Sequence, residues 1–130
     1  MKKTPEWLIV DFVLSAHEFA LASEGGLSGV RDHGLLESAL DRPKNLFNYE
    51  GADIIELAVC YADAIIRNHP FVDGNKRTAF ISMYAFLKEN RHQFRGAEAE
   101  VVVMFEGFAN KTVKKTEFTL WVRENTIKNN

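Results

Sequence analysis

Apolar residues recur three and four positions apart along most of the chain, and this spacing predicts helices rather than strands. Six segments show the pattern, and each is flanked by residues that commonly start or end a helix. The only candidate strand is the short run His92–Phe94. The pattern therefore predicts an all-α fold, a compact single-domain bundle of about six helices. The expected helices cover residues 5–24, 35–40, 54–67, 75–90, 98–110 and 116–126.

Local signals define the ends of these helices and leave one segment without predicted structure. Thr4-Pro5 combines an N-cap residue with a proline at the first helical position. Asp53 is expected to cap the most apolar helix. The helix over residues 35–40 is expected to stop before Pro43, because a proline disfavours helical backbone in the residue that precedes it. Residues 44–51 are then interpreted as a connector.

Length and composition are those of an ordinary globular protein. The chain has 130 residues, of which 46% are hydrophobic and 26% are charged, so residues 1–130 are expected to form one domain with its own core. Cys60 is the single cysteine, which excludes a disulfide framework and a cysteine-rich zinc site. The sequence has no apolar run of membrane-spanning length and no signal-peptide pattern. These features predict a cytoplasmic protein that is not associated with a membrane.

The charge is unevenly distributed, and its distribution is more informative than the net charge of −2. Residues 1–65 carry a net charge of −6, whereas residues 66–95 carry +4. A short basic segment inside an acidic protein indicates a local anion site, since a nucleic-acid surface needs a broader basic field. Direct binding of nucleic acid is therefore not expected.

The connection between the two most apolar helices carries most of the polar chemistry. The first amides of a helix lack partners within the helix and lie at the positive end of its dipole, so a helix that starts at Gly74-Asn75 can bind an anion. Gly74 allows a tight backbone that directs several amides at one ligand. Asn75, Lys76 and Arg77 add donors and charge, and Phe71 is expected to enter the core. The segment reads Arg67-Asn68-His69-Pro70-Phe71-Val72-Asp73-Gly74-Asn75-Lys76-Arg77-Thr78.

Two residues of this connection could supply reaction chemistry. A neutral His69 beside a phosphate can take a proton from an attacking hydroxyl. Asp73 can hold a magnesium ion that bridges phosphate oxygens. Each of these residues alone is more often part of a turn or a helix cap. A base, a carboxylate, a glycine and a cluster of donors within ten residues are seldom combined by chance, so the sequence predicts a phosphate-transfer site.

Other polar residues support weaker hypotheses. His17-Glu18 resembles the start of a zinc-protease motif, but residue 21 is leucine, so no second histidine completes it. Arg31-Asp32, in a glycine-rich loop, is interpreted as an ion pair that fixes this loop. Neither a Walker loop nor a Gly-x-Gly-x-x-Gly motif occurs, which excludes the two most common nucleotide-binding folds.

The segment His69-Pro70-Phe71-Val72-Asp73-Gly74-Asn75-Lys76-Arg77-Thr78 resembles the motif of the Fic/Doc superfamily, in the version found in Doc toxins. Residues 25–43 are also similar to Doc-type sequences. Fic proteins transfer the AMP part of ATP to a protein hydroxyl, and they have glycine at the position of Lys76 and a second arginine at the position of Phe80. Both departures from the Fic pattern match the Doc branch.

The resemblance implies a Fic/Doc-like helical fold and a kinase that transfers the γ-phosphate of ATP to a threonine of elongation factor Tu, which arrests translation. It makes His69 the general base and Asp73 the magnesium ligand. Phosphates would be held by the residues Gly74, Asn75, Lys76 and Arg77, with Arg67 in a supporting role.

The resemblance also concerns regulation. Many Fic proteins inhibit themselves with a glutamate four residues after a serine or threonine, and this sequence has no such pair. A Doc-type toxin is instead inhibited by a small antitoxin whose disordered C-terminal segment folds into a groove on the toxin. Two alternatives stay open: transfer of AMP by the same residues, and a catalytically silent helical binding module.

Overall fold

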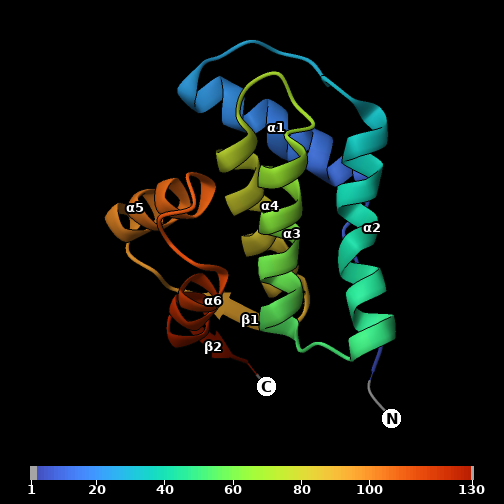
Figure 1. Cartoon of the computed structure of the whole chain (residues 1–130), viewed down its shortest axis with the longest axis vertical. Coiled ribbons are helices and arrows are strands. Elements are labelled where there is room, and N and C mark those ends of the chain that lie inside the picture. The colour runs from blue at the N-terminus through green and yellow to red at the C-terminus, as the bar shows by residue number, and fades with distance from the viewer. Residues whose placement is uncertain (1–2, 130) are drawn as a thin grey trace.

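The computed structural model describes residues 3–129, which form six helices and one small two-stranded sheet. The central helix α3 is flanked by α2 and α4, while α1 lies across one end of these helices (Figure 1). The all-α expectation is confirmed, including the number of helices. The elements are α1 (Val10–Glu24), α2 (His33–Glu50), α3 (Ile54–Asn68), α4 (Asn75–Glu89), β1 (His92–Phe94), α5 (Glu98–Ala109), α6 (Lys115–Glu124) and β2 (Thr126–Lys128).

Helix α3 forms the centre of the core, and the polar connection that contains His69 follows its last residue. Its start is fixed by a capping box, in which the Asp53 carboxylate accepts the Glu56 N–H at 2.9 Å and the Glu56 carboxylate accepts the Asp53 N–H at 3.0 Å. Residues 57–66 are all buried, because α2, α4 and α6 pack around this helix. Cys60 is among them, and burial raises the pKa of its thiol.

Helix α2 is longer than the sequence predicts. It continues through Pro43 to Glu50, so the expected stop before Pro43 and the connector over residues 44–51 are both wrong. A proline inside a helix removes one hydrogen bond and costs about 3 kcal/mol. Here Pro43 is buried on the face of α2 that packs against α3, and this tertiary packing offsets the local cost. The helix ends at Gly51, whose φ of 61° is readily adopted by glycine.

Helix α1 is shorter than predicted. It starts at Val10, and residues 4–9 run as an extended segment over the core rather than as a first helical turn after Thr4-Pro5. Trp7 stacks on Phe86, with ring centroids 6.0 Å apart, and the Leu8 N–H donates to Tyr61 Oη at 3.1 Å. These contacts with residues far along the chain favour an extended backbone over the local helix start.

Residues 126–128 form a short strand that the sequence pattern does not indicate. The candidate strand His92–Phe94 is present as β1, and it pairs with β2 in antiparallel register, so that Gln93 lies opposite Ile127. A strand of three residues shows too little alternation to be recognised without its partner. The pairing fixes the end of α6 beside the end of α4.

The buried hydroxyl of Tyr61 should make the fold sensitive to alkali. Burial raises the pKa of Tyr61 to about 12 from its ordinary value of 10.0. Because the folded state favours the protonated phenol, its contribution to stability is complete below pH 10 and is lost as the pH rises towards 12. The loss amounts to about 2–3 kcal/mol. Tyr61→Phe should abolish this part of the pH dependence, measured by urea unfolding between pH 9 and pH 12. An unchanged pH dependence in the variant would contradict the assignment.

Candidate active site

The connection between α3 and α4 places His69 beside the start of α4. His69 follows the last turn of α3 with φ 49° and ψ 55°, and its N–H donates to the Ile65 carbonyl at 3.0 Å. Left-handed backbone is uncommon for a residue other than glycine, and it turns the chain away from the helix axis. The His69 side chain is exposed at the mouth of a cavity of about 320 Å³. The cavity is lined by Ile66, His69, Asp73, Gly74, Asn75, Lys76 and Ala109.

The N-terminus of α4 faces the same cavity and offers free donors. The first hydrogen bond of the helix runs from the Thr78 N–H to the Gly74 carbonyl at 3.0 Å. The amides of residues 75–77 precede this bond and have no acceptor within the helix. Gly74 caps the helix with φ 80°, a conformation that costs glycine little. Within residues 3–129 no acceptor binds these amides, so a base and a set of available donors share one cavity.

The glycine-rich loop before α2 makes hydrogen bonds to the segment that contains His69. Arg31 donates from Nε to the His69 carbonyl at 2.8 Å and from Nη2 to the Asn68 carbonyl at 3.0 Å. Its own N–H donates to the Pro70 carbonyl at 2.7 Å. The predicted ion pair with Asp32 is not formed, because Asp32 instead caps α2 and accepts the Leu35 N–H. Arg31 thus fixes the connection by binding carbonyl groups.

Asp73 is positioned by the same loop. Its Oδ2 accepts the Leu27 N–H at 2.8 Å. Among residues 3–129, no donor binds the other carboxylate oxygen, Oδ1. The side chain is exposed and lines the cavity, so one oxygen is held while the second can bind a cation. A histidine from α1 contacts the Asp73 backbone, with His17 Nε2 at 2.8 Å from the carbonyl oxygen.

The side chain of Asn75 is used inside the connection. Its Oδ1 accepts the Phe71 N–H at 3.1 Å, and its Nδ2 donates to the Phe71 carbonyl at 2.9 Å. Asn75 is 6% exposed, and Phe71 is fully buried, as the sequence predicts. What Asn75 can present to a ligand in this structure is its backbone N–H, while its side-chain amide closes the loop.

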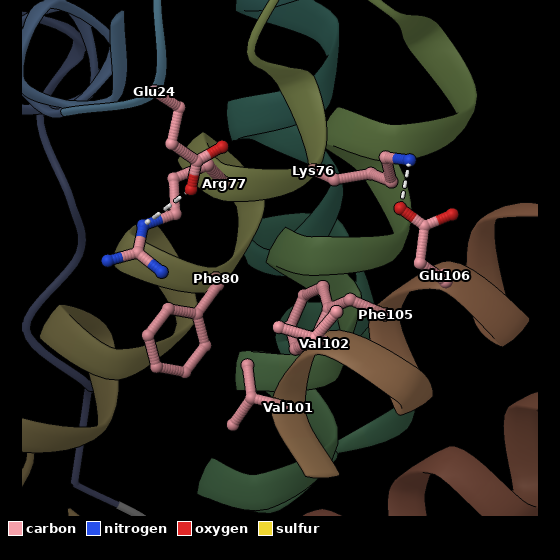
Figure 2. A pocket seen from close by; sticks show the side chains of 8 residues that line it. All are labelled: Glu24, Lys76, Arg77, Phe80, Val101, Val102, Phe105 and Glu106. Carbon is pink, nitrogen blue, oxygen red and sulfur yellow. Dashed lines mark hydrogen bonds and ion pairs between the residues drawn. The ribbon is translucent and has the colours of Figure 1, made fainter. Parts of the chain in front are cut away.

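Lys76 and Arg77 diverge from the first turn of α4 (Figure 2). Lys76 binds Glu106 on α5, and Arg77 lies 3.6 Å from the Glu24 carboxylate at the end of α1. Both cations border a second cavity of about 130 Å³, and Lys76 also lines the first. Arg77 Nε is buried and donates no hydrogen bond within the described part of the chain. The second cavity is lined by Glu24, Lys76, Arg77, Phe80, Val101, Val102, Phe105 and Glu106.

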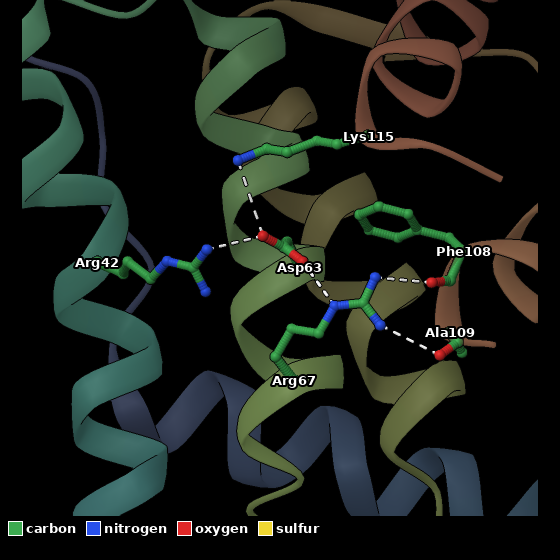
Figure 3. A network of polar contacts seen from close by, with 6 residues as sticks. All are labelled: Arg42, Asp63, Arg67, Phe108, Ala109 and Lys115. Atoms are coloured by element: carbon green, nitrogen blue, oxygen red, sulfur yellow. Dashed lines mark hydrogen bonds and ion pairs between the residues drawn. The ribbon is translucent and has the colours of Figure 1, made fainter. Parts of the chain in front are cut away.

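Arg67 does not line the cavity, and its side chain extends to the end of α5 (Figure 3). Its guanidinium donates to the carbonyls of Phe108 at 2.7 Å and Ala109 at 3.1 Å, where α5 ends. It also binds Asp63 at 3.2 Å, and this buried carboxylate further contacts Arg42 and Lys115. All three interactions are structural, so the phosphate role of Arg67 stays a prediction that these contacts do not favour.

Sequence comparison identifies the family. A sequence model of the Fic/DOC family matches residues 7–87, which is more than half of the chain, so the chain belongs to this family. It is 35% identical to the protein kinase doc of Escherichia phage P1 over 79 residues, which is 60% of this chain and 63% of that protein. It is 38% identical to the toxin Doc of Mycolicibacterium smegmatis over 89 residues, 65% of each chain. The matched segments thus span just under two thirds of each relative.

Two further observations bear on ligands and surroundings. Within residues 3–129, no group of three or more His, Cys, Asp and Glu side chains is arranged to hold a metal ion. None of the helices in this range has both the length and the apolar character needed to cross a membrane.

Proposed function

We propose that this protein is a Doc-type toxin, a kinase that transfers the γ-phosphate of ATP to a threonine hydroxyl of a translation protein, elongation factor Tu. The observation that carries the proposal is the shared cavity of His69 and the N-terminus of α4. One relative is named a protein kinase and the other a toxin, which agrees with this function.

The cavity has the donors that a polyphosphate requires. The free amides at the start of α4 and the positive end of its dipole favour an anion. Lys76 lines the cavity, and Arg77, which borders the second cavity with its Nε 3.6 Å from the Glu24 carboxylate, would reach a phosphate from that side. These donors therefore fit the phosphates of ATP.

Asp73 is the residue that would hold magnesium. It offers one free carboxylate oxygen beside the amides of α4, and the remaining ligands would come from phosphate oxygens and water. The metal ion, when bound with ATP, neutralises charge on the phosphates.

His69 would act as the general base in the transfer. Its imidazole takes the proton of the threonine hydroxyl as the hydroxyl oxygen bonds to the γ-phosphorus. The bond between that phosphorus and the oxygen bridging to the β-phosphate breaks, and ADP leaves. The amides at the start of α4 stabilise the charge on the transferred group. Arg31, through the His69 carbonyl, holds the base in place.

The second cavity supports γ-phosphate rather than AMP transfer. It adjoins the first at Lys76 and presents the Phe80 ring where Fic proteins have a second arginine. An aromatic ring and the neighbouring valines suit a nucleoside better than a phosphate. If the nucleoside occupies this side, the γ-phosphate is the group that lies next to His69.

Regulation of the proposed kinase would come from a separate protein. We infer that a small antitoxin with a disordered C-terminal segment binds the toxin, because the chain lacks the Ser/Thr-x-x-x-Glu pair of self-inhibited Fic proteins. The proposed acceptor, elongation factor Tu, places this activity in the cytoplasm.

The proposal is tested by determining which phosphate of ATP is transferred to the acceptor protein. The protein is incubated with elongation factor Tu and ATP that carries the label at the α- or the γ-phosphate, and the labelled acceptor is counted. Wild-type protein should transfer γ-label and no α-label. Lys76→Gly should lower γ-transfer at least about tenfold, the effect of losing one hydrogen bond to a charged group.

Lys76→Met is the matched variant, because it keeps the volume of the stem and removes the charge. It should lower γ-transfer as much as Lys76→Gly does, provided that the ammonium group is what binds phosphate. Glu106→Ala, which frees Lys76 from its ion pair, should keep γ-transfer. Transfer of α-label by the wild-type protein would replace the kinase with an AMP transferase.

A further inference from the structure

His17 reaches the phosphate-binding segment from a distant part of the sequence. It lies on α1 with 4% of its surface exposed, and its ring stacks on Phe71 with centroids 3.9 Å apart and an interplanar angle of 8°. Its Nε2 lies 2.8 Å from the Asp73 carbonyl oxygen. A carbonyl oxygen can only accept, so Nε2 carries the proton and donates.

This hydrogen bond determines the orientation of one peptide group. The C=O and N–H of a trans peptide point in opposite directions, and the described chain contains no cis peptide. Because His17 holds the Asp73 carbonyl towards α1, the Gly74 N–H points away from α1. The cavity beside His69 is lined by Gly74 and by no residue of α1. Within residues 3–129, no acceptor binds the Gly74 N–H.

Gly74 does not fix this orientation by itself. Glycine adopts positive and negative φ with similar ease. The φ of 80° at Gly74 therefore does not by itself prevent rotation of the Asp73–Gly74 peptide. A rotated peptide would present the carbonyl oxygen, and thus negative partial charge, to the site where phosphate is expected. Some other group must select the observed orientation, and His17 is the group that binds it.

We propose that His17 is a positioning residue, whose Nε2–H holds the Asp73–Gly74 peptide so that the Gly74 N–H faces the phosphate cavity. The inference rests on the proposed function for its role in transfer. Its geometric part concerns anion binding alone, which can be measured without any acceptor protein. The Phe71 stack fixes the plane of the imidazole, and the hydrogen bond sets the peptide.

The test follows the Gly74 amide by NMR while sodium pyrophosphate is added to ¹⁵N-labelled protein. In wild-type protein the Gly74 amide proton should shift downfield with the amides of residues 75–77. His17→Phe keeps an aromatic ring against Phe71 and removes the donor. It should raise the Kd for pyrophosphate at least about tenfold, as expected for one lost hydrogen bond to a charged group.

His17→Gln is the rescuing variant, since its side-chain amide places an N–H donor near the position of Nε2. It should keep the Kd within about twofold of the wild-type value. A role in packing alone predicts the reverse order, because glutamine lacks the ring and phenylalanine retains it. In the transfer assay, His17→Phe should lower kcat/KM for ATP while KM for the acceptor protein stays within about twofold.

An unchanged Kd and an unchanged Gly74 shift in folded His17→Phe would overturn the inference. If that variant does not fold, the wild-type titration decides by itself: a Gly74 amide that stays still while residues 75–77 respond overturns the inference, and a Gly74 shift supports it. A wild-type protein that shows the Gly74 shift but transfers no phosphate would refute the proposed kinase and leave the role of His17 intact.

Discussion

His69→Ala is expected to lower the rate of phosphate transfer by about 100- to 10,000-fold, the usual effect of removing a general base. The protein should stay folded, because the His69 side chain is exposed and makes no hydrogen bond within residues 3–129. The structural contacts at this position come from its backbone N–H and C=O, which alanine retains. The rate is measured with γ-labelled ATP, and folding by circular dichroism.

His69→Asn controls for backbone strain at the same position. Residue 69 has φ 49°, and asparagine tolerates left-handed backbone better than alanine does. Asparagine supplies no base, so both variants should be inactive while His69→Asn keeps the higher melting temperature. His92→Ala, on β1, should transfer phosphate at the wild-type rate. Wild-type activity in folded His69→Asn would refute the role of His69 as the base.

Asp63→Ala is expected to reduce the free energy of unfolding by about 2–3 kcal/mol, because it removes the hydrogen bonds of a buried carboxylate to Arg42 and Arg67. Only 8% of the Asp63 side chain is exposed, and its carboxylate contacts three cations at 2.7, 3.2 and 3.7 Å. Arg42, Arg67 and Lys115 come from α2, α3 and the start of α6, so they would repel one another without it (Figure 3). Urea unfolding at pH 7 measures the loss.

Arg123→Ala provides the contrast for this measurement. Arg123 binds Asp53 at 2.9 Å, but both side chains are nearly half exposed, and such pairs contribute about 1 kcal/mol or less. The same urea experiment should therefore separate the two variants clearly. Equal losses in Asp63→Ala and Arg123→Ala would show that the buried network does not hold α2, α3 and α6 together.

The helices that could be predicted are those whose ends depend on nearby residues. The capping box of Asp53 and the left-handed Gly74 act within one turn, and the starts of α3 and α4 follow from them. Pro43 shows the limit, since its local signal to stop is outweighed by packing against α3. Strand β2 depends on a partner more than 30 residues away in the sequence, so no local pattern reveals it.

In the candidate site, too, features that depend on nearby residues could be predicted, and features that depend on residues far apart in the sequence could not. His69, Asp73 and Lys76 are close in sequence, and the structure brings them around one cavity. The direction of Arg67 could not be predicted, because its acceptors lie on α5, about 40 residues away. His17 was missed for the same reason, although one signal was present. It is a polar residue among the buried residues of α1, and a buried polar residue needs a hydrogen-bond partner.

The burial of Cys60 has a practical consequence for spectroscopy. Its thiol is 1% exposed and its pKa is raised by burial, so it should react slowly with maleimides, because the thiolate is the form that attacks these reagents. The natural chain then behaves towards these reagents like a cysteine-free protein. A cysteine placed at Val103, which is 66% exposed on α5, would carry a fluorophore without background labelling. Such a dye could report on movements of α5 during nucleotide binding without any change to the core.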